Sequence, residues 1–319
     1  MVSVISLDRI RIGLFAALGI AACDAAEPDG NPTTSVGETG ADPALCEVDN
    51  HPDRRCVTVE GECPDCSVVD CTVLIYEATL CQPSGIESEC GPGVQDNTCC
   101  FIVDGDDEVC DGRPFVVHGH KRTASVTQRT DWRREVGNAT TREHWIERAL
   151  DEHASVAAFA RFVLELLAVG APSEFIADAA SAMRDEVEHA RVCFAIAGHD
   201  AGPGPLPTAD ASVETDLETI ARNTLVEGAI GETLAAIRAA RDAEREDDPA
   251  VRAVLERIAV DETRHAALAW RFVRWAIQQR PTIAPSLQRT FEEALERAGL
   301  PEVESTVLRP CFEAVAHAA

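Results

Sequence analysis

Apolar positions recur at helical spacing throughout the carboxyl-terminal part of the chain. From about residue 141 they fall three and four positions apart, in a stripe that includes Trp145, Leu150, Ala154 and Phe162. A period near 3.6 residues places such side chains on one face of an amphipathic helix. The polar positions between them would face solvent, so this region is predicted to be helical.

Glycine, proline and aspartate divide the region into separate helices. Gly170 to Pro172 forms one break, residues 199–211 are rich in proline and glycine, and Asp247 to Pro249 forms another break. Proline suits the first turn of a helix, which agrees with helices that begin after each break. The pattern predicts long helices from about 141 to the first break and over about 172–198, 212–245 and 249–279, then shorter ones over 287–298 and 302–316.

Four acidic stretches lie on the long helices in a repeating order. Glu152 and Glu227 are single glutamates among small and apolar residues, whereas Glu186 and Glu262 each begin a Glu-x-x-His motif. Glu152 to Glu227 is 227 − 152 = 75 positions, and Glu186 to Glu262 is 262 − 186 = 76 positions. Near-equal spacings predict a duplicated helical hairpin. Residues i and i+3 share a helix face, so each motif aims its glutamate and histidine at one point.

Buried carboxylates need a counter-charge, because an unpaired one costs several kcal/mol. Two divalent cations would balance four glutamates, and two imidazoles would complete the ligand set. Carboxylate and imidazole ligands together suit iron or manganese. The ligand set thus suits two Fe ions, with Mn or a mixed Fe/Mn pair as alternatives and zinc less specifically. The predicted metal ligands are Glu152, Glu186, His189, Glu227, Glu262 and His265.

The repeat also predicts how the ligands divide between the two metals. We expect Glu186 and Glu262 to bridge them. The remaining glutamate and histidine of each hairpin would bind one metal each, Glu152 with His189 and Glu227 with His265. The alternative is that these acids simply lie on solvated helix faces, but solvated faces have no reason to keep Ala154 beside an acid.

Three further acids are expected to support the site. Asp185 and Asp261 each precede a motif histidine by four positions, where a carboxylate can accept a hydrogen bond from the second ring nitrogen of a ligating histidine. Glu232 follows Glu227 by five positions and is expected to line the site or to pair with an arginine, with a displaced extra carboxylate of the site as the alternative. Cys193 is expected to pack in the core or to form a disulfide with Cys311. No catalytic residue is assigned.

The amino terminus has the pattern of a secretory signal. Arg9 and Arg11 precede the apolar run Ile12–Ala22, which is too short to span a bilayer. The run ends at Cys23 in a sequence that resembles a bacterial lipobox, in which the cysteine is lipidated. Residues 1–23 are thus expected to be a lipoprotein signal peptide, with a cleaved signal and an incidental cysteine as the alternative. The mature protein would lie in the cell envelope, outside the cytoplasm and anchored to a membrane by lipid.

Between the signal and the helices we expect three segments. Residues 24–45 have almost no large apolar side chains and suit a flexible tether. Residues 46–110 suit a small module held by up to five disulfides, as expected in an oxidising compartment, with a metal site at Cys63 and Cys66 as the alternative. Residues 111–140 form a linker. The cysteines of the module are Cys46, Cys56, Cys63, Cys66, Cys71, Cys81, Cys90, Cys99, Cys100 and Cys110.

The motifs resemble those of the ferritin-like superfamily of di-iron carboxylate proteins, in particular bacterial ferritin-like domain proteins. The resemblance covers residues 145–279, under half of the chain, and is carried by Glu152–Phe162, Glu227–Ala236 and Asp261–Trp270. It implies an all-α fold over residues 141–319, with a four-helix bundle from a duplicated hairpin and a di-iron centre that reacts with dioxygen or peroxide. The only tyrosine, Tyr76, lies outside this region, which disfavours the tyrosyl-radical branch.

Function remains open at the level of the reaction. The leading hypothesis is an oxidoreductase acting on an unknown envelope substrate or partner, and the alternatives are a non-catalytic metal-binding protein and an interaction module of the cell envelope. A net charge of −27 argues against binding to the phosphate backbone of nucleic acids, which requires clustered lysine and arginine.

Overall fold

The architecture is taken from a computed structural model, in which the chain divides into two units that are described separately. The first unit comprises residues 1–22, 111–293 and 300–319, and the second comprises residues 23–110 and 294–299. The structure describes residues 4–18, 54–58, 81–82, 93–95, 98–102, 109–110, 112–118, 120–132, 134–136, 145–198, 200–298 and 303–317. Strands before residue 112 are described by their backbone alone.

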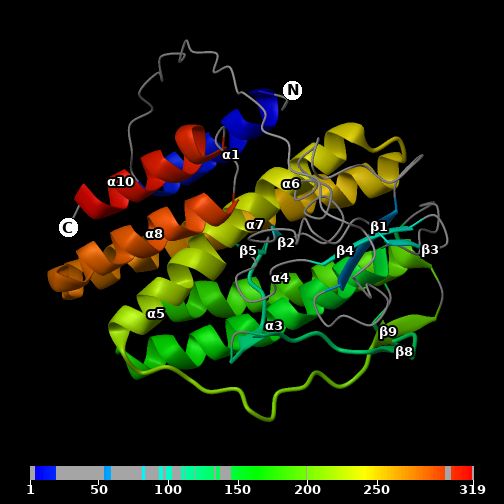
Figure 1. Ribbon diagram of the computed structural model, residues 1–319, viewed down its shortest axis with the longest axis horizontal. Coiled ribbons are helices and arrows are strands. Elements are labelled where there is room, and N and C mark those ends of the chain that lie inside the picture. Colours follow the sequence, from blue (N-terminus) through cyan, green and yellow to red (C-terminus); the bar gives the residue numbers. More distant parts are fainter. Residues whose placement is uncertain are drawn as a thin grey trace, which may run out of the picture. The chain divides into compact units, whose positions relative to one another are not determined.

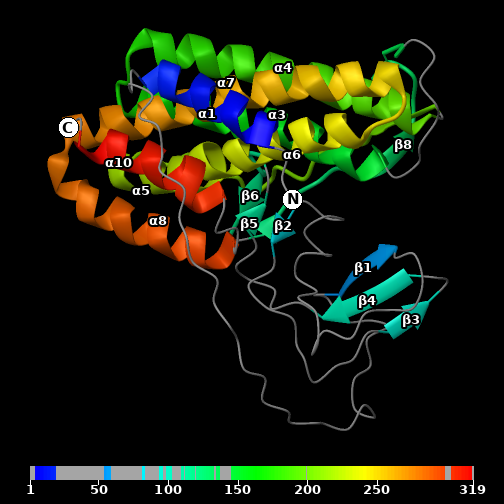
Figure 2. The ribbon, with the colours of Figure 1, turned by 90° about the horizontal axis from the view of Figure 1, so that it is seen from above.

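The first helical pair is built from α3 (Trp145–Ala168) and α4 (Ser173–Ala197). Figures 1 and 2 show these two green helices side by side, and their backbones are in extensive contact. The helices are separated by the break that the sequence predicted. Gly170 has φ +66°, a left-handed conformation that glycine adopts at low cost at a helix end.

The second pair consists of a composite helix and α7 (Pro249–Gln279). The composite helix runs through α5 (Leu217–Asn223), the π-helical turn η2 (Thr224–Ile230) and α6 (Gly231–Arg245). The sequence predicted a single uninterrupted helix here. In the structure, Gly231 N donates to Val226 O, five residues earlier, which is the π pattern.

Capping residues set where the helices of the second pair begin. Asp216 accepts a hydrogen bond from Thr219 N at 3.0 Å, and Asp248 accepts one from Ala250 N at 2.9 Å. An aspartate at this position satisfies a backbone N–H that has no partner inside the helix. The predicted start of the third long helix, near residue 212, therefore moves to Leu217.

Long packed helices thus dominate the first unit. Its core includes a cluster of aromatic rings that joins the two pairs: Phe162 of α3 lies edge-on to Phe272 of α7, with ring centroids 5.3 Å apart. Phe175 of α4 packs against the same Phe272 ring at 6.0 Å. Edge-to-face pairs of this kind add to the stabilisation from burial. The predicted helical hairpins are present, and the finer assignment to a ferritin-like four-helix bundle is treated under Proposed function.

Shorter helices follow α7 and pack on the same unit. They are η3 (Pro281–Ile283), α8 (Ala284–Ala298), the π-helical η4 (Glu304–Leu308) and α10 (Arg309–His317). Phe291 of α8 stacks on Phe312 of α10, with ring centroids 4.3 Å apart. These helices agree with the two predicted from the sequence.

The segment predicted as a signal peptide forms α1 (Val4–Leu18), which contacts α6, α7 and α10. Its apolar residues Ile10, Leu14, Phe15 and Leu18 are buried. Cys23, the predicted lipidation site, lies outside the described residues. No helix in the described part of the chain combines the length and apolar character needed to cross a membrane.

The predicted linker packs against the helices. It contains β6 (Val116–Val117), β7 (His120–Lys121) and β8 (Val126–Gln128); β6 pairs with β7, and β8 pairs with β9 (Ala201–Pro203). We call residues 112–117 the strap. Its Phe115 and Val117 are buried against Ala154 and Ala158 of α3.

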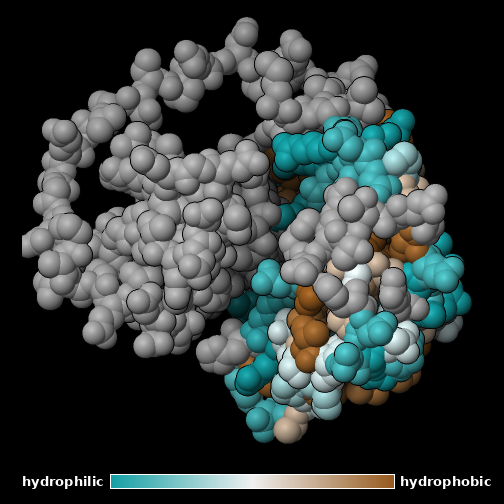
Figure 3. All heavy atoms as spheres, turned by 90° about the vertical axis from the view of Figure 1, so that its right-hand side faces the viewer, coloured by the Kyte–Doolittle hydropathy of each residue, from teal (hydrophilic) through white to brown (hydrophobic). Residues whose placement is uncertain are grey.

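The second unit contains two small antiparallel sheets. One has the strand order β1 (Arg54–Thr58), β4 (Thr98–Ile102), β3 (Gly93–Gln95), and the other pairs β2 (Cys81–Gln82) with β5 (Val109–Cys110). The predicted disulfides concern side chains outside the described residues, and the predicted tether also lies outside them. On the described part of the face in Figure 3, hydrophilic residues surround smaller groups of hydrophobic ones.

Candidate metal centre

Buried acids and histidines from α3, α4, α6 and α7 converge inside the first unit. Among the described residues, two groups could each hold a metal ion, with ligand atoms within 4.8 Å of one another. Glu186 and Glu262 belong to both groups. The first group is Glu152, Glu186, His189 and Glu262, and the second is Glu186, Glu232, Glu262 and His265.

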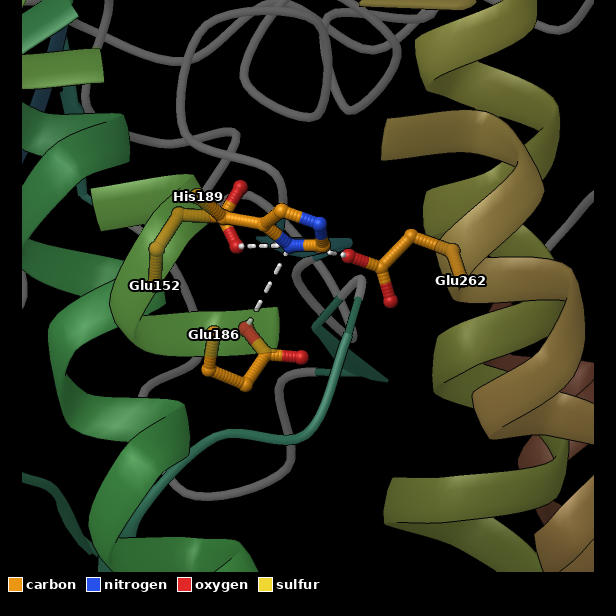
Figure 4. A group of neighbouring side chains, drawn as sticks. All are labelled: Glu152, Glu186, His189 and Glu262. Atoms are coloured by element: carbon orange, nitrogen blue, oxygen red, sulfur yellow. Dashed lines mark ion pairs between the residues drawn. The ribbon is translucent and has the colours of Figure 1, made fainter. Parts of the chain in front are cut away.

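His189 lies at the centre of the first group (Figure 4). Its Nδ1 lies 3.4 Å from Glu152 Oε2, 3.8 Å from Glu186 Oε2 and 3.3 Å from Glu262 Oε1. The three carboxylates, which belong to α3, α4 and α7, therefore surround a single ring nitrogen. Oxygen and nitrogen atoms at such separations can be bound together by one metal ion, whose bonds to them are about 2.0–2.2 Å for zinc.

His265 has the same role in the second group. Its Nδ1 lies 3.0 Å from Glu186 Oε1 and 3.2 Å from Glu262 Oε2. The two shared glutamates thus direct one oxygen to each histidine. The repeat in the sequence predicted that these two glutamates would bridge the metals, and they are the two residues that both groups share.

The second nitrogen of each histidine faces an aspartate. His189 Nε2 lies 3.1 Å from Asp261 Oδ2, and His265 Nε2 lies 3.5 Å from Asp185 Oδ2. A carboxylate in this position holds the ring and favours the tautomer that leaves Nδ1 available to a metal. The sequence predicted both aspartates, but paired each with the histidine of its own helix. In the structure each pairs with the histidine of the opposite helix.

The histidine pKa values reflect this surplus of carboxylates. Burial lowers the pKa of His189, but hydrogen bonds with Asp261 and Glu152 outweigh it and raise that pKa well above its usual range. His265 shows the same balance, with Asp185 and Glu186 raising its pKa. In the absence of metal, the fold therefore favours protonated histidines.

The glutamate pKa values are spread apart. Burial raises the pKa of Glu152 to about 7, despite its hydrogen bond with His189. Burial raises the pKa of Glu232 well above its usual range, and repulsion from Glu262 and Glu186 adds to the rise. Burial also acts to raise the pKa of Glu262, but hydrogen bonds with His189 and His265 outweigh it and hold that pKa well below its usual range.

Glu227 and Glu232 exchange the roles expected from the sequence. Five of the six predicted ligands come together, while the Glu227 carboxylate lies 3.2 Å from Arg161 Nη2 and belongs to neither group. Glu232, expected to line the site or to pair with an arginine, joins the second group. Five residues along a regular α-helix are rotated by about 140° from each other. Glu227 lies within the π turn at residues 224–230 and Glu232 lies just after it, so the turn changes this relation.

A metal pair fits the residues that are present. The ligand glutamates number four, which matches the charge of two divalent cations, and Glu186, Glu232 and Glu262 are only 1–3% exposed. Within the described part of the chain, the buried polar atoms without a hydrogen bond of good geometry include Glu232 Oε1 of the second group and His189 Nδ1 of the first, whose carboxylate neighbours lie 3.3–3.8 Å away. Buried polar atoms seldom stay unpaired, so each group has an atom that a bound metal ion would satisfy.

Three arginines around the site were not predicted from the sequence. Arg148 Nε lies 3.7 Å from Glu152 Oε1, and its Nη1 donates to Asp242 at 3.0 Å. Arg161 and Arg113 lie on the side of Glu227. Arginine is common on helices, and only tertiary packing distinguishes these from solvated residues.

Cys193 lies one turn after His189 on α4, and it is buried and unbonded. Burial raises the pKa of its thiol far above the usual range. Cys311 is likewise unbonded. The predicted disulfide between them does not form, and the alternative, core packing of Cys193 in the hydrophobic cluster around Phe194 and Leu255, is confirmed.

Comparison of the chain with protein-family models, with curated proteins and with solved structures produced no match. The interpretation of the site therefore depends on its own geometry and chemistry.

Proposed function

We propose that the protein is a ferritin-like dinuclear metal protein that binds two iron ions, or manganese in place of one or both, and acts as an oxidoreductase. The observation that carries the proposal is the sharing of Glu186 and Glu262 between two buried ligand groups. One shared carboxylate could arise by chance in a helical core. Two shared carboxylates, each with one oxygen directed to each histidine, favour a pair of metals held close together.

The long helical pairs support the four-helix bundle that the motifs imply. In such proteins inward-facing Glu and Glu-x-x-His residues on facing helices bind the metals. Here α3, α4, α6 and α7 each contribute at least one residue to the groups. A bound iron pair would supply one-electron or two-electron chemistry toward dioxygen or peroxide.

The chain's own residues would prepare the site for that chemistry. Asp261 and Asp185 orient the histidines through Nε2. Arg148 places a positive charge beside Glu152, which opposes the effect of burial and favours an ionised carboxylate ligand. The buried ring of Phe159 packs edge-on against the His265 ring, with centroids 5.2 Å apart, and gives that side of the second group an apolar wall.

Anaerobic titration with ferrous iron tests the proposal. We expect two irons to bind per chain, and oxygen to oxidise both, as measured by the loss of ferrous iron to a chelator assay. Glu186→Gln should weaken binding of both ions, because Glu186 belongs to both groups. Two irons that bind but are not oxidised at a measurable rate would favour the non-catalytic metal-binding alternative. Failure to bind iron or manganese would refute both.

We also propose that the protein is a lipid-anchored envelope protein that acts on an envelope partner and does not bind nucleic acid. The support is the pattern of Arg9, Arg11 and the apolar run before Cys23, together with the net charge of −27. Mass spectrometry of the protein from its native host tests this. A lipid-modified amino-terminal Cys23 would support the anchor, whereas a mature protein that retains α1 would refute it.

A further inference from the structure

A buried cluster of charges lies beside the metal ligands but is not part of either group. It contains Arg161 and Glu165 of α3, Glu227 of η2, and Arg113 of the strap. Two positive and two negative side chains share this cluster, so its formal charges balance. Buried charges are costly unless they are paired, so the pairing indicates a role for the cluster.

Arg161 holds Glu227 in a defined place. Its Nη2 donates to Glu227 Oε2 at 3.2 Å, and its Nη1 donates to Val116 O of the strap at 2.5 Å. Both partners of the ion pair are largely buried, with side chains 15% and 17% exposed. Because Val116 O also binds the guanidinium, Arg161 cannot follow Glu227 if that carboxylate moves toward the histidines.

Arg113 is the second positive charge near Glu227. It is 3% exposed, and its guanidinium lies over the Phe162 ring at 4.0 Å, with a weak hydrogen bond from Nη2 to Thr224 Oγ1 at 3.5 Å. Its pKa is lowered by burial, but attraction to Glu227, then Glu232 and Glu165, opposes this. Arg113 thus supplies a fixed counter-charge on the side of η2.

The strap is held firmly enough to position Arg113. Gly112 N donates to Gly231 O at 2.8 Å, and Ser155 Oγ donates to Arg113 O at 3.0 Å. Gly228 makes room for the guanidinium. A Cβ atom at Gly228 would lie 3.2 Å from Arg113 Nη1 and 2.9 Å from Ala269 Cβ. The absence of a side chain at this residue therefore lets the strap and α7 approach η2 together.

We propose that Arg161 is a positioning residue that holds the Glu227 carboxylate outside the metal cluster, with Arg113 as a second buried positive charge beside η2, so that Glu232 completes the second ligand group. The inference rests on the proposed dinuclear site and extends it to residues that do not touch the metals. Glu227 would be free to compete for a metal only if it left Arg161, and its release would leave that buried guanidinium without its charged partner.

Cobalt(II) binding to the metal-free full chain tests this, with the number of ions bound and the visible absorption per cobalt as the two measurements. We expect two cobalt ions in the wild-type protein. Glu232→Gln should lower the affinity for one of the two cobalt ions by at least tenfold. Glu227→Gln should still bind two cobalt ions and give the wild-type spectrum. The two variants are a matched pair, since the same substitution is made five residues apart on one composite helix.

The arginine variants test the positioning role. Arg161→Gln should alter the cobalt spectrum as Glu227 is released toward the cluster, and the double variant R161Q/E227Q should restore the wild-type spectrum. Arg161→Lys, which keeps the charge, should give a smaller change than Arg161→Gln. The double variant removes one charge of each sign, so it keeps the test available if Arg161→Gln does not fold.

Different outcomes would refute the dinuclear site and the positioning of Glu227. A wild-type protein that binds fewer than two cobalt ions would refute the proposed dinuclear site. With two ions bound to the wild type, loss of one ion in Glu227→Gln would refute the inference alone and return Glu227 to the ligand set. An unchanged spectrum in a folded Arg161→Gln protein would refute the holding role of Arg161.

Discussion

Glu232→Gln should stabilise the metal-free protein, although it removes a metal ligand. Glu232 is 1% exposed, and burial with repulsion from Glu262 and Glu186 raises its pKa well above 4.5. The unfolded chain ionises this residue at neutral pH, whereas the fold opposes its ionisation. Glutamine has almost the same shape and carries no charge, so it should relieve this penalty.

The magnitude follows from the pKa difference. Each pKa unit by which a fold raises a carboxyl group above its unfolded value costs about 1.4 kcal/mol once the pH exceeds the folded pKa. Because the shift at Glu232 is upward and the amide carries no charge, we expect Glu232→Gln to raise the free energy of unfolding by about 1–3 kcal/mol. At about 2–4 °C per kcal/mol for a domain of this size, Tm should rise by several degrees.

The sign of the pH dependence provides a stricter test. A raised carboxyl pKa opposes folding only above the unfolded pKa, and its cost grows until the pH reaches the folded pKa. The stabilisation by Glu232→Gln should therefore be close to zero near pH 4.5 and should increase toward pH 7. Thermal unfolding of chelator-treated protein at several pH values measures it, with Glu227→Gln as the control.

Glu227→Gln, the control on the same helix, should change Tm less. Burial raises the pKa of Glu227 while Arg161 and Arg113 oppose that rise, so relief of the buried charge and loss of the ion pair with Arg161 act in opposite directions. We expect the change in Tm of this control to be smaller than that of Glu232→Gln. A gain in Glu232→Gln that does not vary with pH, or a loss of stability in that variant, would show that repulsion among the carboxylates is not what strains the metal-free site.

Three further predictions concern the site and the core. Because the pKa values of His189 and His265 are raised, metal must displace their protons, so affinity for divalent ions should increase from pH 6 to pH 8; calorimetry in buffers of different ionisation enthalpy should detect the released protons, and pH-independent binding would contradict this. Asp261→Asn should weaken metal binding by about 10–100-fold, whereas Asp178→Asn, at a more exposed ion pair, should leave it unchanged in the same titration. Phe162→Ala should lower the free energy of unfolding by about 3–5 kcal/mol in denaturant titrations. A loss below about 1 kcal/mol would show that neighbouring side chains move into the cavity left by the ring.

Local sequence determined where the helices lie and most of the acidic residues of the candidate metal site. The breaks at Gly170 and Pro249 are local chemistry, because a left-handed glycine ends a helix and an N1 proline begins one. The Glu-x-x-His motifs place two side chains on one face within a single turn, so Glu186 and Glu262 needed no tertiary information to be selected.

Tertiary structure decided which residues meet across helices. The aspartates Asp185 and Asp261 pair with histidines of the opposite helix, which spacing along one helix could not show. The hydrogen-bond shift at η2 depends on packing, since the sequence around Glu227 is compatible with a regular α-helix. Arg113 lay in a predicted linker, where nothing in its neighbours marked it as buried.

Sequence patterns thus identified most of the candidate ligands, and the fold decided that Glu232, and not Glu227, joins them. Periodicity and motif spacing act within one helix, where geometry is set by 3.6 residues per turn. The choice between Glu227 and Glu232 depends on a π turn, on Arg161 and on a strap whose hydrogen-bond partners lie 42 to 119 positions away in the chain. Contacts at that separation are selected by the packing of the whole unit, and local sequence patterns do not record them.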